Sequence, residues 1–446
     1  MSYKTPYHLF RSLHRLKQWL NRRFTVLGKG IIICLLISAI VGIDTRLTMA
    51  YQVFAFLLAA LAIAILFSLR FAARLVVTRT LPRFGTVGVK LQYSVLVENQ
   101  TDKIQKGLSL KENFADSCPS YTEFSHAVST NKYRFTSISY LYYRWRKLVN
   151  RRTKATTKVF DIPTIQAHGK TKVVMEIEPT ARGIIELTGM TIARPDPFAL
   201  FNACKTITLK QSLLILPKRY QVPRLELPGM RKAQSGSTSL AAAVGDSEEF
   251  VSLRDYRPGD PLRKIHWRSW AKTNKPIVRE EREQFFVRHA LILDNFDSNE
   301  YSEIMEETVS VAASFACDFQ TQESLLDLMF VADQAYCFTA GRGLGTTEKM
   351  LEILAAVKTC QDTSFESLTT TVMNRVSLLS GCICILMRWD EARKKLIRNL
   401  QEFNIPTLVL VVTDQQESID DFDLGKIHSL HLGKIQEGLM KLKIEN

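Results

Sequence analysis

Acidic residues are nearly missing from the first fifth of this 446-residue chain. Between Met1 and Lys90 there are thirteen lysines and arginines but a single acid, Asp44, although the net charge of the whole chain is only +15. This excludes a balanced globular surface for the segment. So uneven a distribution is typical of a segment that lies against a membrane or a polyanion.

Two kinds of motif are missing as well. The eight cysteines form no C-x-x-C pair and have no nearby histidine, so we predict reduced, mostly buried thiols. Cys382 and Cys384 lie in the apolar run CICIL, where alternate side chains share one face of a strand, which favours core packing over metal binding. The glycine-rich segment near Gly341 is not followed by Gly-Lys-Ser/Thr, so the protein is not predicted to be an ATPase itself.

Two long apolar segments follow a basic leader, residues 1–23. The first, 24–43, carries only the charge of Lys29, and the second, 47–69, carries none. Each is long enough to cross a hydrocarbon layer of about 30 Å at about 1.5 Å per residue. We therefore predict a transmembrane hairpin over residues 24–69. A buried helical hairpin of a soluble protein is the alternative.

Basic residues flank the predicted hairpin on both sides. They are Lys4, Arg11, Arg15, Lys17, Arg22 and Arg23 before it, and Arg70, Arg74, Arg79 and Arg83 after it. The positive-inside rule then places both ends of the hairpin, and everything that follows it, on the cytoplasmic side of the membrane. A signal peptide fits less well, because a second apolar segment stands where a small-residue cleavage site would be.

Residues 80–217 alternate apolar and polar side chains between turn signals, as in VKLQYSVLVENQ and TKVVMEIEP. Short strands at this spacing predict an antiparallel β-sandwich domain. Within it, residues 133–158 carry eight lysines and arginines, several aromatics and no acid. This basic aromatic patch fits anionic lipid headgroups or single-stranded nucleic acid, and an ordinary solvated hairpin is the third interpretation. Its role stays open.

Residues 218–284 combine a linker rich in Gly, Ser, Ala and Pro with a dense polar block. The block, GDSEEFVSLRDYRPGDPLRKIHWRSWAKTNKPIVREE, mixes acids, bases, one histidine and two tryptophans. Its YRPGDP segment predicts a turn at Pro258 and Gly259, followed by a short helix with Asp260 as N-cap and Pro261 at the first position. Extended chain is expected on both sides.

Three interpretations of this polar block compete. Catalysis would use His266 as a base oriented by a nearby acid, but Ser269 lacks the strained elbow and oxyanion donors of acyl transfer. Nucleic-acid binding is disfavoured because the acids nearly cancel the bases. Alternating signs favour structural arginine–carboxylate pairs beside a buried tryptophan. The predicted participants are Arg254, Arg263 and Arg268 with Glu249, Asp255 and Asp260, and Trp267 or Trp270.

These residues resemble the hallmark of the bacterial "domain of unknown function 58" family, an acid and an aromatic before LRxYxPGDxxRxIHWxxxA. The matching residues are Glu249, Phe250, Leu253, Arg254, Tyr256, Pro258, Gly259, Asp260, Arg263, Ile265, His266, Trp267 and Ala271. Residues 181–201 are similar to the family's sandwich segment, with Arg182, Gly183, Asp196, Pro197 and Phe198 in place. The predicted order, two spans followed by a sandwich, is also similar to the family's arrangement.

The resemblance implies that residues 285–446 form a von Willebrand factor A-like domain. The sequence itself alternates apolar strands, such as HALILDN and CICILM, with helical stretches, which predicts a doubly wound, mostly parallel α/β sheet. Ligands bind such sheets at the carboxyl ends of the strands. The residues there that are similar to the metal-dependent adhesion site of A domains are Asp294, Ser298, Thr346 and Asp390.

A carboxylate with hydroxyls suits Mg²⁺, the only cofactor that the resemblance implies. The motif is degenerate, because Phe296 stands where the first serine of D-x-S-x-S belongs and removes one hydroxyl ligand. Asp294 and Asp390 acting only as helix caps at strand ends is the alternative.

The family is frequently associated with MoxR-type AAA+ ATPases. The resulting hypothesis is a non-enzymatic adaptor or scaffold in the bacterial inner membrane, whose cytoplasmic A-like domain binds a protein partner, with such an ATPase as the candidate. The polar block would then be a structural and docking element. The alternative is an enzyme of envelope or polysaccharide metabolism that uses His266 and nearby acids. The sequence identifies no substrate, partner or oligomeric state.

Overall fold

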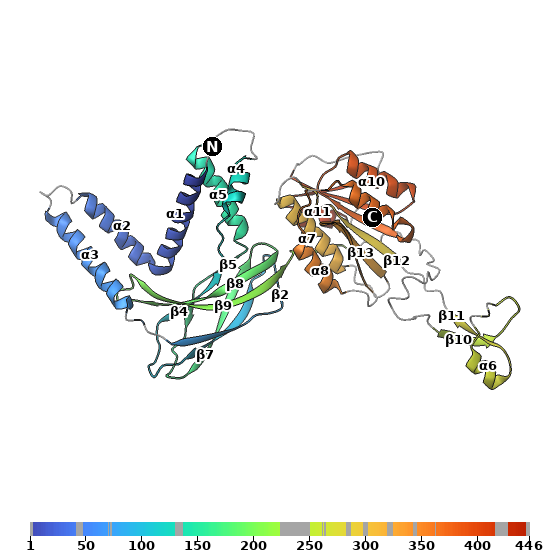
Figure 1. The fold of residues 1–446 in the computed structure, drawn as a ribbon, viewed down its shortest axis with the longest axis horizontal. Coiled ribbons are helices and arrows are strands. Elements are labelled where there is room, and N and C mark those ends of the chain that lie inside the picture. The colour runs from blue at the N-terminus through green and yellow to red at the C-terminus, as the bar shows by residue number, and fades with distance from the viewer. Residues whose placement is uncertain are drawn as a thin grey trace. The chain divides into compact units, whose positions relative to one another are not determined.

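The structure is a computed structural model of the whole chain. It describes residues 3–41, 48–69, 71, 74–129, 137–223, 250–260, 262, 265–281, 287–297, 302–318, 324–341, 346–361, 363–414 and 427–442. The chain divides into two compact units, Met1–Leu216 and Pro217–Asn446 (Figure 1). Both units combine sheets with helices, so the protein is multi-domain.

Three helices open the first unit: α1 (Lys4–Arg23), α2 (Val26–Val41) and α3 (Thr48–Leu69). Among the described residues, Met49–Leu69 is the one helical stretch long and apolar enough to cross a membrane, and α2 is a shorter apolar helix of 16 residues. The Ser38 hydroxyl of α2 donates a hydrogen bond to the Ala50 carbonyl oxygen of α3 at 2.7 Å. The two apolar helices therefore lie side by side.

The rest of the first unit is mostly β-structure. Its strands are β1 (Leu75–Thr80), β2 (Phe84–Thr86), β3 (Leu91–Asn99), β4 (Leu108–Phe114), β5 (Ala155–Thr157), β6 (Phe160–Ile162), β7 (Lys170–Pro179), β8 (Gly183–Pro195) and β9 (Asn202–Leu216). They form two sheets, in the orders β1-β3-β7-β5 and β2-β9-β8-β4-β6. One shared core joins the sheets, and Val95, Met175, Ile192 and Ile215 are fully buried in it. The period-two pattern of the sequence thus produces two layers of sheet.

A buried polar cluster joins the two sheets across this core. Arg79 of β1 forms an ion pair with Glu112 of β4, and both side chains are fully buried. The Tyr93 hydroxyl of β3 donates a hydrogen bond to the other Glu112 oxygen at 2.7 Å. Burial is the main cause that raises the pKa of both Glu112 and Tyr93, although Arg79 opposes it. Because every member has a partner, the cluster fixes the register of the sheets without leaving an unpaired charge.

The basic aromatic patch is not a solvated hairpin, because its described part forms a packed helix. Helices α4 (Tyr121–Ser129) and α5 (Ile138–Arg152) lie between β4 and β5. On α5, Leu141, Trp145 and Val149 recur every four residues and are buried. They pack with aromatic residues of α1 and α4, namely Tyr7, Phe10 and Phe124. The predicted basic leader is therefore a helix docked on this cluster.

The loop between β8 and β9 forms a seat for the start of α2. Asp196 accepts a hydrogen bond from the Leu200 amide at 2.7 Å, which shapes the loop. The Phe24 ring meets the Phe201 ring edge to face at 5.0 Å between centroids. At Gly28, a Cβ atom would lie 2.0 Å from the Leu200 carbonyl oxygen, so only glycine permits this approach. The segment PDPFALF therefore has a structural role.

The second unit contains a six-stranded sheet. Its strands are β12 (Val287–Leu293), β13 (Ser324–Val331), β14 (Ala335–Ala340), β15 (Gly381–Leu386), β16 (Thr407–Thr413) and β17 (Ile427–His431). The order is β14-β13-β12-β15-β16-β17, and all pairs are parallel except β13 with β14. The strand order reverses between β12 and β15, as in doubly wound folds.

Helices cover both faces of this sheet (Figure 1). They are α7 (Glu303–Asp318), α8 (Thr347–Ala356), α9 (Glu366–Met373), α10 (Glu391–Glu402) and α11 (Ile435–Lys441), with a 3-10 turn η3 (Val376–Leu378). One core cluster joins α9 and α10 to Ala290, Ile292 and Cys384, and the alternate residues, such as Leu291, face the side where α7 packs. The predicted alternation of strands and helices agrees with this arrangement, but β14, α9 and β17 were not predicted.

The segment after the last sandwich strand packs on the second unit. The Tyr220 amide donates a hydrogen bond to Ser314 of α7 at 2.8 Å, and its hydroxyl donates one to Glu307 at 2.6 Å. Gln221 exchanges two hydrogen bonds with Gln436 of α11. The predicted linker thus begins with residues that are fixed to the α/β domain, and residues 224–249 lie outside the described part of the chain.

We expect Trp145→Ala to destabilise the first unit by about 3–5 kcal/mol, because it removes a large buried side chain from the α1–α4–α5 cluster. The matched control is Tyr143→Ala on the same helix, where the side chain is exposed and the expected change is within about 0.5 kcal/mol. Urea-dependent pulse proteolysis of the detergent-solubilised chain measures both. Equal unfolding midpoints would show that α5 does not pack as described.

Candidate functional site

The carboxyl ends of β12 and β15 meet where the strand order of the second unit reverses. The two strands pair in parallel from His289 with Gly381 to Leu293 with Ile385. Asp294 directly follows β12, and α10 begins just after β15 with Asp390 as its N-cap. Sheets of this kind bind ligands at this position, so we consider its side chains first.

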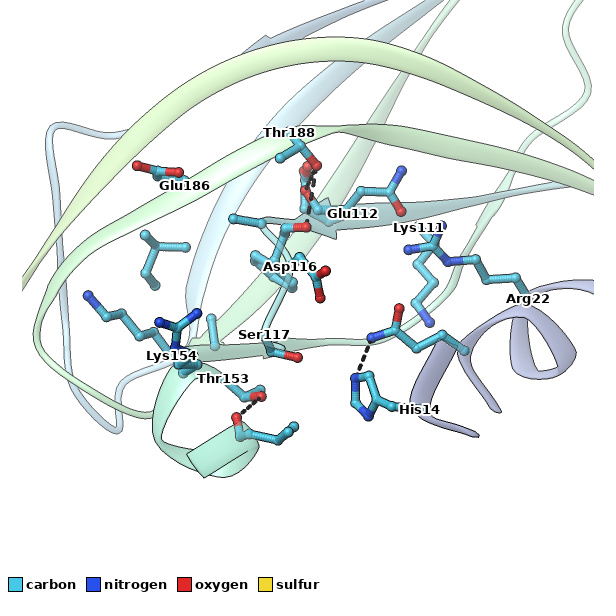
Figure 2. A pocket seen from close by; sticks show the side chains of 18 of the residues that line it. His14, Arg22, Lys111, Glu112, Asp116, Ser117, Thr153, Lys154, Glu186 and Thr188 are labelled. Atoms are coloured by element: carbon cyan, nitrogen blue, oxygen red, sulfur yellow. Dashed lines mark hydrogen bonds between the residues drawn. The ribbon is translucent and has the colours of Figure 1, made fainter. Parts of the chain in front are cut away.

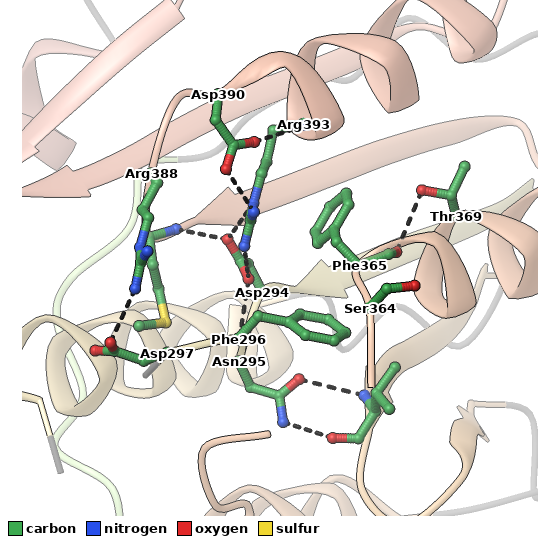
Figure 3. A network of polar contacts seen from close by, with 12 residues as sticks. Asp294, Asn295, Phe296, Asp297, Ser364, Phe365, Thr369, Arg388, Asp390 and Arg393 are labelled. Carbon is green, nitrogen blue, oxygen red and sulfur yellow. Dashed lines mark hydrogen bonds and ion pairs between the residues drawn. The ribbon is translucent and has the colours of Figure 1, made fainter. Parts of the chain in front are cut away.

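Asp294 and Arg393 form a fully buried ion pair at this point (Figure 3). The Arg393 guanidinium donates from Nε to Oδ2 of Asp294 at 3.1 Å and from Nη2 to Oδ1 at 3.0 Å. The backbone amides of Phe296 and Met387 donate to the same two oxygens, each at 3.1 Å. Each oxygen of the Asp294 carboxylate therefore accepts two hydrogen bonds.

The remaining groups of Arg393 also have partners. Its Nη1 donates to Oδ2 of Asp390 at 2.7 Å, and the other Asp390 oxygen caps α10 by accepting the Arg393 amide. The guanidinium carbon lies 4.2 Å from the centre of the Phe365 ring. Two carboxylates and an aromatic face thus enclose one permanent cation, which is shared by the two acids that the sequence places at the strand ends.

Neighbouring side chains use the same segment to tie strands together. Asn295 donates hydrogen bonds to the carbonyl oxygens of Val331, at the end of β13, and of Lys358. Asp297 pairs with Arg388 at 2.9 Å. Phe296 is buried in the core with Phe365, the two ring centroids being 5.4 Å apart.

The predicted metal ligands do not fit a divalent cation. Asp294 and Asp390 do lie together, but the Arg393 guanidinium occupies the place between them that a cation would need. Thr346 uses its hydroxyl to cap α8 by accepting the Lys349 amide, and Ser298 lies outside the described residues. Within the described ranges, no group of three or more His, Cys, Asp or Glu residues is arranged to hold a metal. Of the two aspartates, Asp390 caps a helix, as the alternative had it, whereas Asp294 accepts the Phe296 and Met387 amides and caps none of the described helices. Arg393 is the partner that both aspartates share.

The polar block forms a small separate motif. Strands β10 (Phe250–Asp255) and β11 (Ile277–Glu281) pair antiparallel, and α6 (Trp267–Thr273) lies between them in the chain. Ile265 forms an isolated bridge with Val278, and both are buried. The His266 amide donates to the Ile277 carbonyl oxygen at 2.8 Å, which fixes the start of α6 against β11.

Arg254 and Asp260 make a bidentate pair that closes the turn of this motif. Both guanidinium–carboxylate contacts measure 2.8 Å, and the Arg257 amide donates to the same carboxylate at 2.9 Å. The hydrogen bonds from Arg254, and next that from the Arg257 amide, lower the pKa of Asp260 to about 2. Gly259 has φ +107°, as the predicted turn requires. Asp260 does not cap α6, whose N-cap is His266 and which starts later than predicted.

The prediction that Trp267 or Trp270 is buried is wrong. Helix α6 has no buried residue, and the Trp267 side chain is 64% exposed. The two indole rings stack on each other, with centroids 5.2 Å apart and planes 21° apart. Leu262 nearby in sequence is also exposed. The motif pairs Arg254 with Asp260 and presents the Trp267 ring outward, because a seven-residue helix and two short strands cannot enclose two indoles.

His266 makes one side-chain hydrogen bond that bears on the catalytic interpretation. Its Nδ1 lies 2.7 Å from the Ser269 hydroxyl oxygen. The candidate orienting acids for His266 are Asp255 and Asp260. Asp260 is engaged with Arg254, and Asp255 is exposed. A serine–histidine pair is therefore present, but it lacks the third member of a triad among these contacts.

Some predicted signature residues cannot be placed. Glu249 and Arg263 lie outside the described residues, and Phe250 is described only by its backbone in β10. Tyr256 donates its amide hydrogen to the Pro276 carbonyl oxygen at 2.9 Å, which continues the pairing beyond β10, and Pro258 belongs to the turn. Arg393 was missed altogether. Its local signal was a basic residue three positions after a predicted helix cap.

We expect Asp294→Ala to destabilise the second unit by about 3–5 kcal/mol, because it leaves the Arg393 charge buried and partly unpaired. Glu391→Ala, at a position in the first turn of the same helix where the side chain is 78% exposed, should change stability by only about 0–1 kcal/mol. Pulse proteolysis in urea measures the unfolding midpoints of both variants.

Because the donors do not fit a divalent ion, the urea midpoint of wild-type unfolding should be the same with EDTA or Mg²⁺. A midpoint that depends on Mg²⁺, or an Asp294→Ala variant that unfolds at nearly the wild-type midpoint, would contradict this interpretation.

Comparisons with known proteins agree with the sequence hallmark. Residues 252–382 match the model of the family described as "Protein of unknown function DUF58". No curated protein matches the chain. Among solved structures, the ASH / PapD-like domain of human CEP192 (PapD-like domain 7) is similar over 32% of this chain and 84% of that domain, with 14% sequence identity and a TM-score of 0.18. The match covers most of the polar block and strands β12, β13 and β14 of the α/β sheet, so this part of the chain is similar to the DUF58 family.

Proposed function

We propose that this protein is a non-enzymatic adaptor of the bacterial inner membrane, anchored by two spans, with both termini and both soluble units in the cytoplasm. Its C-terminal α/β domain is then von Willebrand factor A-like and binds a protein partner. The family resemblance implies a MoxR-type AAA+ ATPase as the partner class.

One observation carries the adaptor proposal: on the polar block, the exposed Trp267 ring stacks on the half-buried Trp270 ring. Exposed tryptophan is costly in water, and tryptophan and arginine dominate the energetics of protein interfaces. Arg268 and Arg257 are exposed in the same motif. Such a surface favours a protein partner over a small molecule.

Two further features support the anchor and the domain type. Helix α3 has the length and apolarity of a membrane span, and basic residues precede α2 and follow α3 in the sequence. The parallel sheet with one antiparallel strand, β14, next to β13 is compatible with an A-like domain. In this proposal the Arg393 guanidinium takes the structural place of the metal ion, so partner binding does not require one.

Trp267→Ala tests the docking surface. We expect affinity purification of the detergent-solubilised protein with Mg²⁺-ATP to co-purify a AAA+ ATPase with wild type and to lose it, by about tenfold or more, with Trp267→Ala, because interface tryptophans commonly contribute about 2 kcal/mol or more. Lys272→Ala, an exposed residue of the same helix, is the matched control and should retain the partner. If no ATPase is recovered from any sample, the proposed class of partner is wrong. If both variants recover the ATPase equally, the proposed docking surface around Trp267 is wrong.

The second candidate function is hydrolysis by the His266–Ser269 pair, which the 2.7 Å contact favours. A fluorophosphonate probe labels serines that a neighbouring base activates. We expect no labelling of Ser269, because these contacts provide neither an orienting acid nor an oxyanion site. Labelling that is lost in both Ser269→Ala and His266→Ala would instead establish the enzyme alternative in envelope metabolism.

A further inference from the structure

A pocket of about 940 Å³ lies in the first unit, beside the buried Arg79–Glu112 pair (Figure 2). Five elements contribute to its lining: α1, β4, the end of α5, the first residue of β5 and the beginning of β8. The volume falls in the range of small-molecule sites. All of the lining residues belong to one compact unit.

One wall of this pocket carries positive charge that no acid neutralises. Arg22, in the last turn of α1, and Lys111 of β4 lie on the same side of the pocket (Figure 2). Within the described part of the chain, neither side chain has an ion-pair partner. Lys29 lies close enough to add to their repulsion, and its ammonium group donates only to the neutral Asn21 amide oxygen at 2.8 Å.

The surroundings lower the pKa of the Lys111 ammonium group. Partial burial is the main cause that lowers the pKa of Lys111, and the positive charges of Arg22 and Lys29 lower it further. A half-buried lysine without a carboxylate is unfavourable for the free protein, since its charge is both desolvated and repelled. Arrangements of this kind are typical of sites that await an anion.

The pocket contains other charged groups. Asp116 also lines it, but its carboxylate accepts the Cys118 amide at 3.0 Å, and the basic groups that interact with it are Arg15 and His14. Lys154 donates to the Ile184 carbonyl oxygen at 3.1 Å. Glu112 accepts from Arg79 and Tyr93 in the core. Among the basic residues of the pocket, Arg152 pairs with Glu123. Glu186 lies on the side of the pocket opposite Arg22 in Figure 2. The uncompensated charge is therefore concentrated at Arg22 and Lys111.

We propose that this pocket binds a phosphate ester through Arg22 and Lys111, with the Gln18 amide and the His14 ring beside them as hydrogen-bonding groups. Arginine offers paired donors to phosphate oxygens, and lysine adds a compact charge. Gln18 and His14 are held to each other at 2.8 Å and line the same pocket. The ligand is either a soluble phosphate ester or the phosphate headgroup of a membrane lipid, because Arg22 lies only four residues before the first apolar helix. The site does not depend on the adaptor proposal.

Two arms distinguish the sources of the phosphate. In the soluble arm, glycerol 3-phosphate is titrated calorimetrically into the full chain held in phosphatidylcholine nanodiscs. In the lipid arm, the chain is released from nanodiscs of mixed phosphatidylcholine and phosphatidylglycerol, and native mass spectrometry counts the phosphatidylglycerol that it retains. Lys111→Gln and Arg22→Gln are compared with Lys172→Gln, the matched charge change at an exposed strand position that does not line the pocket.

We expect one arm to show binding that falls about tenfold or more in each pocket variant, as for loss of a charge-assisted hydrogen bond, and that persists in Lys172→Gln. Lys111→Gln should unfold no earlier than wild type, because it removes a repelled and partly desolvated charge. A site with a purely structural role would give the opposite stability result. The proposal is overturned if neither arm shows binding, or if Lys172→Gln weakens it as much as the pocket variants do.

Discussion

The buried Arg393 guanidinium is the interaction on which the second unit depends. It joins the end of β12, through Asp294, to the start of α10, through Asp390, at the place where the strand order reverses. A buried charge is tolerable only when it is paired and hydrogen-bonded, and here each of the three guanidinium nitrogens donates to a carboxylate oxygen. The strand ends are thereby used for architecture. In the proposed adaptor, recognition by this unit then uses other surfaces, such as the exposed Trp267 of the polar block.

Much of the fold could be predicted because burial imposes a period on the sequence. Alternation in the sandwich strands and the succession of apolar strands and helices after residue 285 both reflect which side chains leave water. Helix α5 was missed because arginines and tyrosines obscured the four-residue spacing of Leu141, Trp145 and Val149. The antiparallel β14 was missed because its side chains are mostly half-exposed.

The candidate site was only partly predictable, for a different reason. Asp294 and Asp390 were found because residues that follow strands gather at one edge of a parallel sheet. Their partner could not be found, because the pairing of Asp294 with Arg393 spans 99 positions and leaves no periodic signal. The exposure of Trp267 reverses the usual expectation for tryptophan, and only packing could reveal it. On β4, by contrast, adjacent residues divide two tasks: Glu112 is paired with Arg79 in the core, and Lys111 contributes its charge to the pocket.

The seat between α2 and the β8–β9 loop has a mechanical consequence. Because Gly28 has no side chain, the backbone of α2 packs directly against the Leu200 carbonyl. The Phe24 and Phe201 rings pack edge to face beside this contact. A helix held at such close range has little freedom to pivot on its own. If the apolar helices lie in a bilayer as proposed, they respond to its thickness by tilting, and the sandwich must tilt with them. Lipid composition would then set the angle at which the cytoplasmic part is presented.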